Sequence, residues 1–292
     1  MENAHHGTGP VAVIPPDLDA DRIRAQLRSR VIGRLLTVVG EVRSTNDVAL
    51  DAARTAGAEG LAVVADRQTA GRGRRGRGWL SPPGVGLYTS ILLRPGCPPA
   101  RASLLVLVAG LAVVEALREV AGIPSDLKWP NDVLVEGRKA AGILAEMASA
   151  EAGVDHAVVG IGINVNHGLT DFPQALQSSA TSLYLSTGRR ILRSDLAAAV
   201  FNALDDWYGL FTAGEFGTIL TAARERSAVL GRQVDVAEGE SRWCGLALDL
   251  DQDGALLVQA ADGERRRVLA ADVSVRPSRP VWFLRAERKN QD

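Results

Sequence analysis

The sequence predicts an α+β domain followed by a small all-β domain, and three observations support this. Helical and strand-like periodicities are mixed from about residue 34 to residue 227. Residues 101–121 are apolar on nearly every side of a helix, which predicts a helix buried against a sheet. After Ser227 only short strand-like runs remain, and they are separated by three turn-forming pairs, Glu238-Gly239, Asp253-Gly254 and Asp262-Gly263.

The first part of the chain predicts a tail and then alternating helices and strands. In chain order we expect a loosely docked or disordered tail over 1–18, a helix over 19–32, a strand over 36–39, a helix after Ser44, and strands over 61–65 and 87–93. Ser44 and Asp47 are spaced as in a capping box, and Gly57 is expected to end the helix that Ser44 begins. The glycine-, arginine- and proline-rich stretch from Gln68 to Gly86 predicts a long loop.

The remaining elements follow from the same periodicities. Gly122 and Pro124 stop the apolar helix. Beyond them we expect strands over 132–135 and 140–147 joined by a turn at Gly137, a strand over 154–165, helices over 194–212 and 215–226, and a small β-barrel over 230–277.

Composition excludes several classes of protein. The chain has 292 residues with 33 basic and 34 acidic side chains, and a net charge of −1 argues against a nucleic-acid coat protein or a membrane-surface polycation. The longest apolar run, Leu104 to Val114, is too short to cross a bilayer, and the N-terminus lacks the pattern of a signal peptide. Cys97 and Cys244 lie far apart without a CxxC motif, which excludes a disulfide framework or zinc ribbon and favours a reducing cytoplasm.

The most distinctive motif is the arginine loop, defined as residues 71–79 with the sequence GRGRRGRGW. Its glycines allow a ligand to approach the backbone closely, and its arginines offer fixed charged forks to phosphate or carboxylate oxygens. The match to GxGxxG does not predict a dinucleotide fold, because the glycines and prolines that follow forbid the required helix. A nucleic-acid-binding arginine–glycine segment and a merely solvated charged loop are the alternatives.

Three further motifs carry candidate chemistry. Residues 128–132, KWPND, combine a cation, an amide and a carboxylate, which suits nucleotide phosphates and Mg²⁺ but also an ordinary turn. Residues 160–166, GIGINVN, alternate so that glycine and amide groups share one face of a strand, for a flat ligand or for close sheet packing. Lys139 begins a strand of small residues, where it is either exposed or directed into a pocket.

The order of these motifs resembles that of the biotin protein ligases. The resemblance covers roughly residues 34–277 and rests on Ser44-Thr45-Asn46, the run Gln68 to Trp79, KWPND at 128–132, Lys139 with Ala141 to Glu146, GIGINVN at 160–166, and Ala180-Thr181-Ser182-Leu183. It implies a mixed-sheet catalytic domain of the biotin/lipoyl ligase type with a small SH3-like β-barrel C-terminal domain. The corresponding boundaries are an N-terminal tail and short helix over 1–33, the catalytic domain over 34–227, the SH3-like domain over 228–277 and a C-terminal tail over 278–292.

The resemblance also implies a two-step reaction in the cytoplasm. Biotin reacts with Mg²⁺-ATP to give biotinyl-5′-AMP, and a lysine of a biotin carboxyl carrier domain of an acyl-CoA carboxylase then accepts the biotin. The implied biotin-binding residues are Ser44, Thr45, Asn46, Gln68, Gly71, Arg72, Gly73, Arg74, Lys139 and Gly142. The implied ATP and adenylate residues are Arg74, Trp79, Lys128, Asn131, Asp132, Gly162 and Asn164. Lys139, Arg74 and Asp132 are the implied catalytic residues, with Asp132 a candidate Mg²⁺ ligand.

One departure from the family bears on regulation. Many bacterial members carry an N-terminal winged-helix domain that represses biotin genes, whereas here 43 residues precede Ser44. We therefore expect a ligase that binds neither specific nucleic acid nor membrane. A lipoate or octanoate protein ligase or transferase is the alternative within the same catalytic fold.

Overall fold

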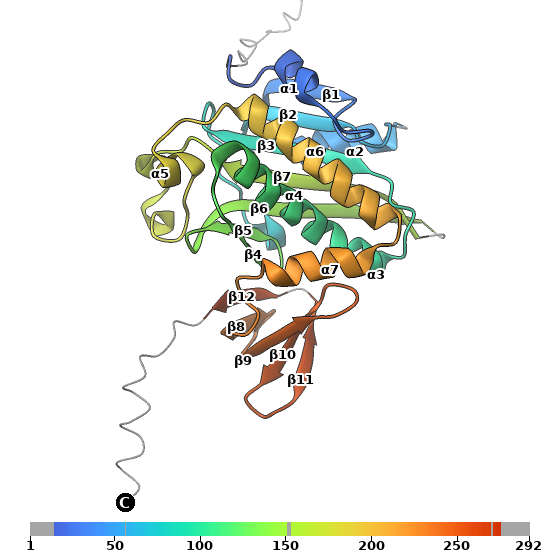
Figure 1. Cartoon of the computed structure of the whole chain (residues 1–292), viewed down its shortest axis with the longest axis vertical. Coiled ribbons are helices and arrows are strands. Elements are labelled where there is room, and N and C mark those ends of the chain that lie inside the picture. Colours follow the sequence, from blue (N-terminus) through green and yellow to red (C-terminus); the bar gives the residue numbers. More distant parts are fainter. Residues whose placement is uncertain (1–14, 56, 151–152, 270, 276–292) are drawn as a thin grey trace, which may run out of the picture. The chain divides into compact units, whose positions relative to one another are not determined.

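The computed structural model describes residues 15–55, 57–150, 153–269 and 271–275 (Figure 1). The chain divides into two compact units, Met1–Ala228 and Val229–Asp292. Most of the predicted N-terminal tail and all of the predicted C-terminal tail lie outside the described residues.

The first unit is built on a mixed seven-stranded sheet. Its strands are β1 (Leu36–Val42), β2 (Ala62–Gln68), β3 (Gly86–Leu93), β4 (Asp126–Lys128), β5 (Asp132–Val135), β6 (Arg138–Ala150) and β7 (Gly153–Asn164). They lie in the order β1-β2-β3-β7-β6-β5-β4. β1 and β2 run parallel and the other neighbours run antiparallel, which confirms the predicted mixed sheet.

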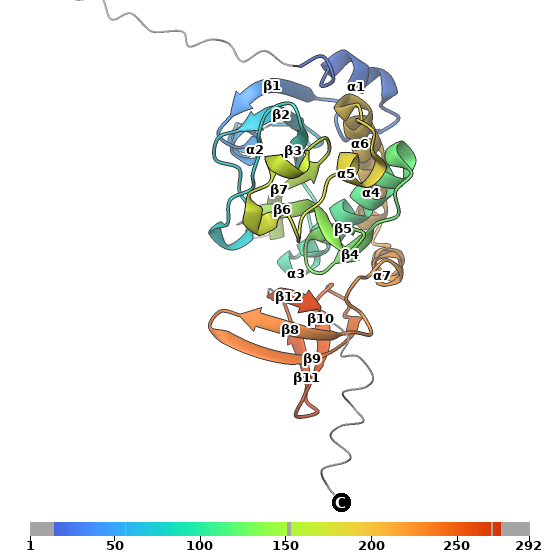
Figure 2. The same cartoon turned by 90° about the vertical axis from the view of Figure 1, so that its left-hand side faces the viewer.

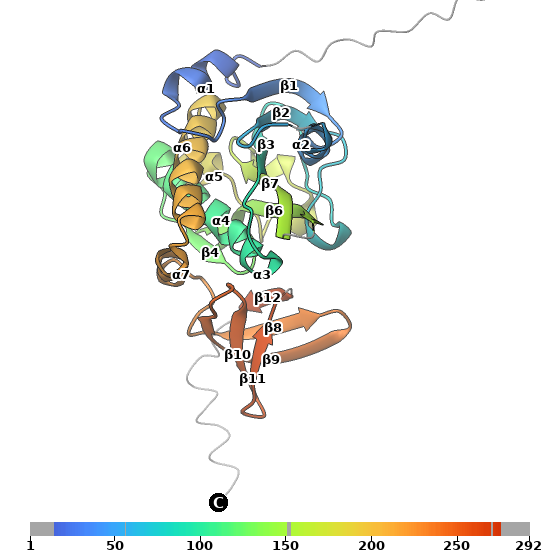
Figure 3. The ribbon, with the colours of Figure 1, turned by 90° about the vertical axis from the view of Figure 1, so that its right-hand side faces the viewer.

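Helices lie on both faces of this sheet (Figures 2 and 3). They are α1 (Ala20–Gln26), α2 (Thr45–Arg54), α3 (Pro99–Ala102), α4 (Leu104–Ala121), α5 (Leu183–Thr187), α6 (Arg193–Thr212) and α7 (Phe216–Glu225), with 3₁₀ turns at Arg74–Gly76, Leu169–Asp171 and Gln174–Leu176. α4 and α6 pack against each other on one face, and α2 contacts β2, β3 and β7 on the other. The stretch Pro99–Ala121 is long and apolar enough to span a membrane, but 72% of its most apolar window is buried in the protein. This stretch is the predicted core helix, divided at Ser103.

The two faces of β7 have different neighbours, as its alternating pattern predicts. Ile161 and Ile163 are buried on one face. On the other face, a Cβ added at Gly160 would lie 2.2 Å from Asn46 Oδ1, and one added at Gly162 would lie 2.5 Å from the Trp79 ring. Glycine is thus required where α2 and the arginine loop approach the sheet.

The predicted helix over 19–32 is wrong beyond Gln26. Leu27 is extended, and the N–H groups that follow it donate to side chains of α6 instead of helical carbonyls. Asn202 Oδ1 accepts from Arg28 and Ser29, and the Asp205 carboxylate accepts from Arg30, Val31 and Ile32. These tertiary acceptors replace the i−4 carbonyls that a longer helix needs.

Three smaller expectations at the N-terminal end differ in detail from the structure. The end of the predicted tail is docked, because Leu18 is fully buried and Asp17 pairs with Arg193, while residues 1–14 lie outside the described residues. Ser44 is the N-cap of α2, but its side chain makes no cap hydrogen bond, and Asp47 pairs with Arg72 instead of completing a capping box. α2 ends at Arg54, before Gly57, whose N–H donates to the carbonyl of Ala52.

The second unit is a five-stranded antiparallel sheet. Its strands are β8 (Gln233–Glu238), β9 (Ser241–Leu250), β10 (Leu256–Ala260), β11 (Arg265–Val268) and β12 (Asp272–Val275), in the order β11-β10-β9-β8-β12. The three predicted turn glycines, Gly239, Gly254 and Gly263, all have φ between 62° and 85°. A core that includes Val234, Val236, Leu256 and Val258 packs the sheet, as the alternation of these strands predicts.

Candidate active site

A row of facing residues crosses the sheet and forms the floor of the candidate site. The row runs Lys128, Asp132, Gly142, Gly162, Tyr88 over β4, β5, β6, β7 and β3. Directly opposed residues on neighbouring strands point to the same face. The sheet therefore places two charged side chains at one end of a glycine surface that a flat group can lie against.

Trp79 lies over this glycine floor. A Cβ at Gly142 would come within 2.9 Å of its ring, and one at Gly162 within 2.5 Å. The indole Nε1 is buried without a hydrogen-bond partner among the described residues. Trp79 thus covers the glycine floor, and its Nε1 is a donor that a ligand could satisfy.

Lys139 and Asp132 form an ion pair beside the floor. Their Nζ and Oδ1 atoms are 2.6 Å apart, and Lys139 Nζ lies 5.2 Å from the centroid of the Trp79 ring. The backbone of Lys139 pairs with residues 179–181, which fixes where its side chain begins. The Lys139 ammonium therefore lies beside the glycine floor and the Trp79 ring.

The arginine loop meets the KWPND motif above the same floor. Arg74 Nη1 donates to Asn131 Oδ1 at 3.3 Å. Asn131 is held by two bonds to Ile143, one from its side-chain amide and one to its backbone carbonyl. Two motifs separated by more than fifty residues thus place a guanidinium, an amide and the Lys139–Asp132 pair in one place.

A network of hydroxyl and amide groups connects α2 to β2 and β3. Thr45 donates to Gln68 Oε1 from both its backbone N–H and its hydroxyl, at 2.9 and 3.1 Å. Gln68 Nε2 donates in turn to Ser81 Oγ, and Ser90 Oγ donates to Asn46 Oδ1. Ser44 lies beside them with its side chain buried. These neutral donors and acceptors suit a neutral polar ligand such as a cyclic urea.

Arg72 joins this network to two carboxylates. Its guanidinium donates to Asp47 at 2.6 Å and to Glu146 at 3.0 Å, and Asn46 Nδ2 also donates to Glu146. Partial burial opposes its charge, but the hydrogen bonds to Asp47 and Glu146 outweigh that cost and hold the pKa of Arg72 above its ordinary value. Arg72 is already paired in this state, so an anionic ligand would replace carboxylates.

Two glycines shape the loop itself. A Cβ at Gly71 would lie 2.6 Å from the carbonyl oxygen of Trp79, and Gly73 N donates to the Arg77 carbonyl at 2.6 Å. The backbone is thus folded tightly on itself, and residues 75–78 at its tip are exposed.

Two predicted site residues stand at the margin. Asn164 is buried, and its side chain donates to the carbonyl of Thr181 at 3.0 Å, so it connects β7 to the segment before α5. Lys128 is half-buried at the edge strand β4. Sequence reasoning missed Asp47, Ser81, Ser90 and Glu146. Only Glu146 had a signal, because it ends the Ala141–Glu146 motif.

The comparisons with known proteins agree with this geometry. The profile of the biotin/lipoate A/B protein ligase family matches residues 39–164, and that of the biotin protein ligase C-terminal domain matches residues 229–276. The biotin–acetyl-CoA-carboxylase ligase of Mycobacterium tuberculosis is 35% identical over 269 residues, covering 88% of this chain and 96% of that protein. The chain belongs to the biotin protein ligase family.

Further relatives extend the match. The bifunctional ligase/repressor BirA of Bacillus subtilis is 36% identical over 261 residues, covering 89% of this chain and 80% of BirA. The structure of the Aquifex aeolicus biotin protein ligase in complex with biotin and ATP superimposes with a TM-score of 0.72 at 35% identity, over 84% of this chain and all of that one. The predicted ligase family, mixed-sheet catalytic fold and separate SH3-like C-terminal domain are confirmed.

Proposed function

We propose that this chain activates biotin as biotinyl-5′-AMP at the expense of ATP and transfers it to a lysine of a biotin carboxyl carrier domain. The single observation that carries this is the meeting of Arg74, Asn131, Lys139 and Asp132 above the floor of Gly142 and Gly162. The neutral donors and acceptors of Thr45 and Gln68 suit a flat, neutral ring, and the cations Arg74 and Lys139 suit a carboxylate and phosphates.

The first step is a displacement at phosphorus. A carboxylate oxygen of biotin forms a bond to the α-phosphorus of ATP, and the bond to the pyrophosphate oxygen breaks. Both reactants are anionic, so catalysis requires fixed positive charge where they meet. Lys139 and Arg74 supply it, and release of Lys139 from Asp132 frees the ammonium to bind the carboxylate and the α-phosphate. The unpartnered Nε1 of Trp79 offers a further donor.

Mg²⁺ is implied by the ATP chemistry, and the residues present fit an ion that is held by one carboxylate together with the nucleotide phosphates. Among the described residues no cluster of three or more metal-binding side chains exists. Mg²⁺ on nucleotides is commonly held by one or two carboxylates together with phosphate oxygens. Asp132 would hold the ion in this manner, and the ion would neutralise phosphate charge.

The second step is acyl transfer to the carrier. The neutral amine of the acceptor lysine attacks the carbonyl carbon of the mixed anhydride, and the bond from that carbon to the phosphate oxygen breaks to release AMP. Asp132 lies beside Lys139 and is suited to take the proton that the acceptor lysine loses. Closure of the arginine loop would keep water from the adenylate.

The predicted partner and location are parts of the same proposal. The acceptor is a biotin carboxyl carrier domain of an acyl-CoA carboxylase, and Cys97 and Cys244 are free thiols, which suits a reducing cytoplasm. Absence of specific DNA binding stays a prediction. Lipoate as substrate is less favoured, because the C-terminal unit matches the biotin protein ligase profile.

The test is ATP-dependent biotin transfer. The purified chain is incubated with biotin, Mg²⁺-ATP and a carrier domain, and labelling is detected with streptavidin. We expect one labelled lysine per carrier, formation of pyrophosphate, and no labelling when ATP is omitted. Lipoate in place of biotin should give no product. Equal transfer of lipoate, or transfer without ATP, would contradict the proposal.

A further inference from the structure

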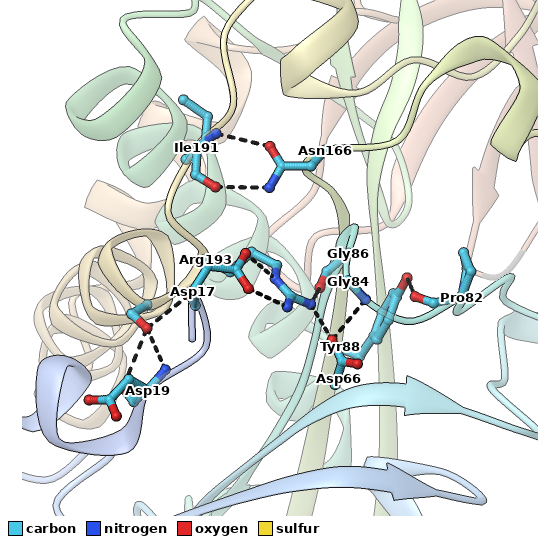
Figure 4. Close-up of polar contacts among 11 residues, drawn as sticks. Asp17, Asp19, Asp66, Pro82, Gly84, Gly86, Tyr88, Asn166, Ile191 and Arg193 are labelled. Atoms are coloured by element: carbon cyan, nitrogen blue, oxygen red, sulfur yellow. Dashed lines mark hydrogen bonds and ion pairs between the residues drawn. The ribbon is translucent and has the colours of Figure 1, made fainter. Parts of the chain in front are cut away.

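The chain returns from the arginine loop to β3 through residues 82–86, which we call the return segment. Figure 4 shows hydrogen bonds that hold its backbone at Pro82, Gly84 and Gly86. Tyr88 OH donates to the carbonyl of Pro82 at 3.1 Å (Figure 4). Asn166 N donates to the carbonyl of Val85 at 2.6 Å. The end of the loop is therefore built into the sheet, although its tip is exposed.

One carboxylate stands at the centre of these contacts. Asp66 Oδ1 accepts from Gly84 N at 2.8 Å and from Arg193 Nη1 at 2.7 Å. The same Arg193 nitrogen donates to the carbonyl of Gly86 at 3.0 Å. Asp66 and Gln68 lie two residues apart on β2, so they share a face of that strand. Gln68 holds Ser81, where the loop leaves the site, and Asp66 holds the return segment a few residues later.

Arg193 is itself fully buried and held from the far side. Its Nε and Nη2 donate to both carboxylate oxygens of Asp17, at 2.8 and 2.7 Å. Among the described residues, Asp17 forms hydrogen bonds and an ion pair with Arg193 and Ser194 but none with the return segment. The buried Arg193 guanidinium donates to two carboxylates and one carbonyl. Movement of the guanidinium would break one of these bonds and leave a buried polar group without a partner, so its position is closely fixed.

We infer that Asp66 and Arg193 are positioning residues for the arginine loop: they fix the return segment and thereby the height of Arg72, Arg74 and Trp79 above the glycine floor. Asp17 supports only the arginine. The kinetic part of this inference rests on the proposed function, whereas the structural part does not.

The experiment compares Asp66→Ala with the matched control Asp17→Ala. Each removes one carboxylate from Arg193, but only Asp66 contacts Gly84. Hydrogen–deuterium exchange of the free protein is followed for peptides covering 82–86. We expect Asp66→Ala to accelerate exchange there about tenfold, the effect of one charge-assisted hydrogen bond, and Asp17→Ala to leave it within about twofold. Equal exchange in the two variants, or wild-type exchange in Asp66→Ala, would overturn the inference.

A second measurement separates positioning from general stability. With biotin and ATP, Asp66→Ala should release biotinyl-5′-AMP about tenfold faster and raise the KM for biotin, with a smaller change in kcat. Asp66→Asn, which keeps the acceptor oxygen, should restore most of the retention. If Asp66→Ala does not fold, Arg193→Lys takes its place, because lysine cannot reach Asp66, Gly86 and Asp17 together.

The outcomes distinguish the two proposals. If the wild type makes no adenylate, the proposed function fails, while the exchange data still decide the positioning role. If exchange responds as expected but release of the adenylate is unchanged by Asp66→Ala, the return segment does not control ligand retention and the inference is overturned.

Discussion

Two arginines of the first unit each lie between two carboxylates, and they differ chiefly in burial. Arg72 is 35% exposed, and its partners Asp47 and Glu146 are 38% and 33% exposed. Arg193 is 0% exposed, and its partners Asp17 and Asp66 are 27% and 6% exposed. An arginine between two carboxylates thus occurs once at the solvent-accessible candidate site and once inside the protein.

The difference teaches what burial does to an ion pair. A half-exposed pair gains little, because water and salt screen it, so Arg72 can exchange its carboxylates for a ligand at small cost. A buried guanidinium cannot lose a partner without leaving a desolvated charge behind. Burial opposes the charge of Arg193, yet hydrogen bonds to Asp17 and Asp66 outweigh it and raise its pKa. The first arrangement suits binding and the second suits positioning.

The largest effect is expected from Arg193→Met. Methionine keeps the apolar stem but leaves Asp66 buried without its cation, and we expect a loss of about 3–5 kcal/mol in the free energy of unfolding. Urea denaturation followed by circular dichroism measures it. The control is Arg22→Met, which removes a partly exposed pair with Asp195 and should cost less than about 1 kcal/mol. A similar loss in both variants would contradict the distinction.

The second effect concerns His167, which lies fully buried near the Arg193 cluster. Neither ring nitrogen has a hydrogen-bond partner among the described residues. Burial lowers its pKa to about 4; the charge of Asp171 opposes this shift, and the smaller effect of Arg193 adds to it. The folded protein keeps this ring neutral while the unfolded chain protonates it near pH 6.5. Its contribution is therefore complete above pH 6.5 and is lost as the pH falls toward 4.

The size of that loss is about 3 kcal/mol between pH 6.5 and 4. Unfolding free energies at half-unit steps of pH should show this slope in the wild type. His167→Leu, in which the new side chain has a similar volume, should remove this pH dependence. The carboxylates titrate at lower pH and should change the free energy of unfolding equally in both proteins. An unchanged slope in the variant would mean that other groups cause the acid sensitivity.

The third effect separates binding from folding at Arg72. Arg72→Ala should change the free energy of unfolding by less than about 1 kcal/mol, because the pair is half-exposed. It should weaken biotin binding about tenfold or more, the value of one charge-assisted hydrogen bond. Isothermal titration with biotin measures the affinity, and Arg54→Ala, which breaks the exposed pair with Asp51, is the control. Loss of stability without loss of affinity would assign Arg72 to the fold.

The sequence predicted those parts of the site that depend on local pattern. The alternation of residues 160–166 predicted the glycine face, because strand period alone decides which side chains share a face. The run of arginines and glycines predicted an anion-binding loop. In the structure Lys139 is paired with Asp132 beside Trp79, and its role in catalysis stays a prediction.

What could not be predicted depends on contacts between distant segments. Arg193 and Asp17 lie 176 residues apart, and neither has a neighbour that marks it as buried. The early end of α1 also depends on a contact between distant segments. The N–H groups of residues 30–32 donate to the Asp205 carboxylate on α6 instead of to helical carbonyls. These bonds also hold the pKa of Asp205 below its usual range although burial raises it. Helix propensity carries no information about such acceptors.

The smallest effect is the difference in salt dependence between the two clusters. In double-mutant cycles for Arg72–Glu146 and Arg193–Asp66, each residue is replaced by alanine singly and together, and unfolding is measured in low and high salt. The coupling energy of the exposed pair should be below about 1 kcal/mol at low ionic strength and should nearly vanish in 1 M NaCl, where the screening length is about 3 Å. The buried pair should have a larger coupling, about 2–3 kcal/mol, that changes little with salt, because ions do not reach a guanidinium with no exposed surface. Equal salt sensitivity would show that the Arg193 cluster opens to solvent in the folded state. The return segment would then be held by the sheet alone, and burial would not be what separates the two arginines.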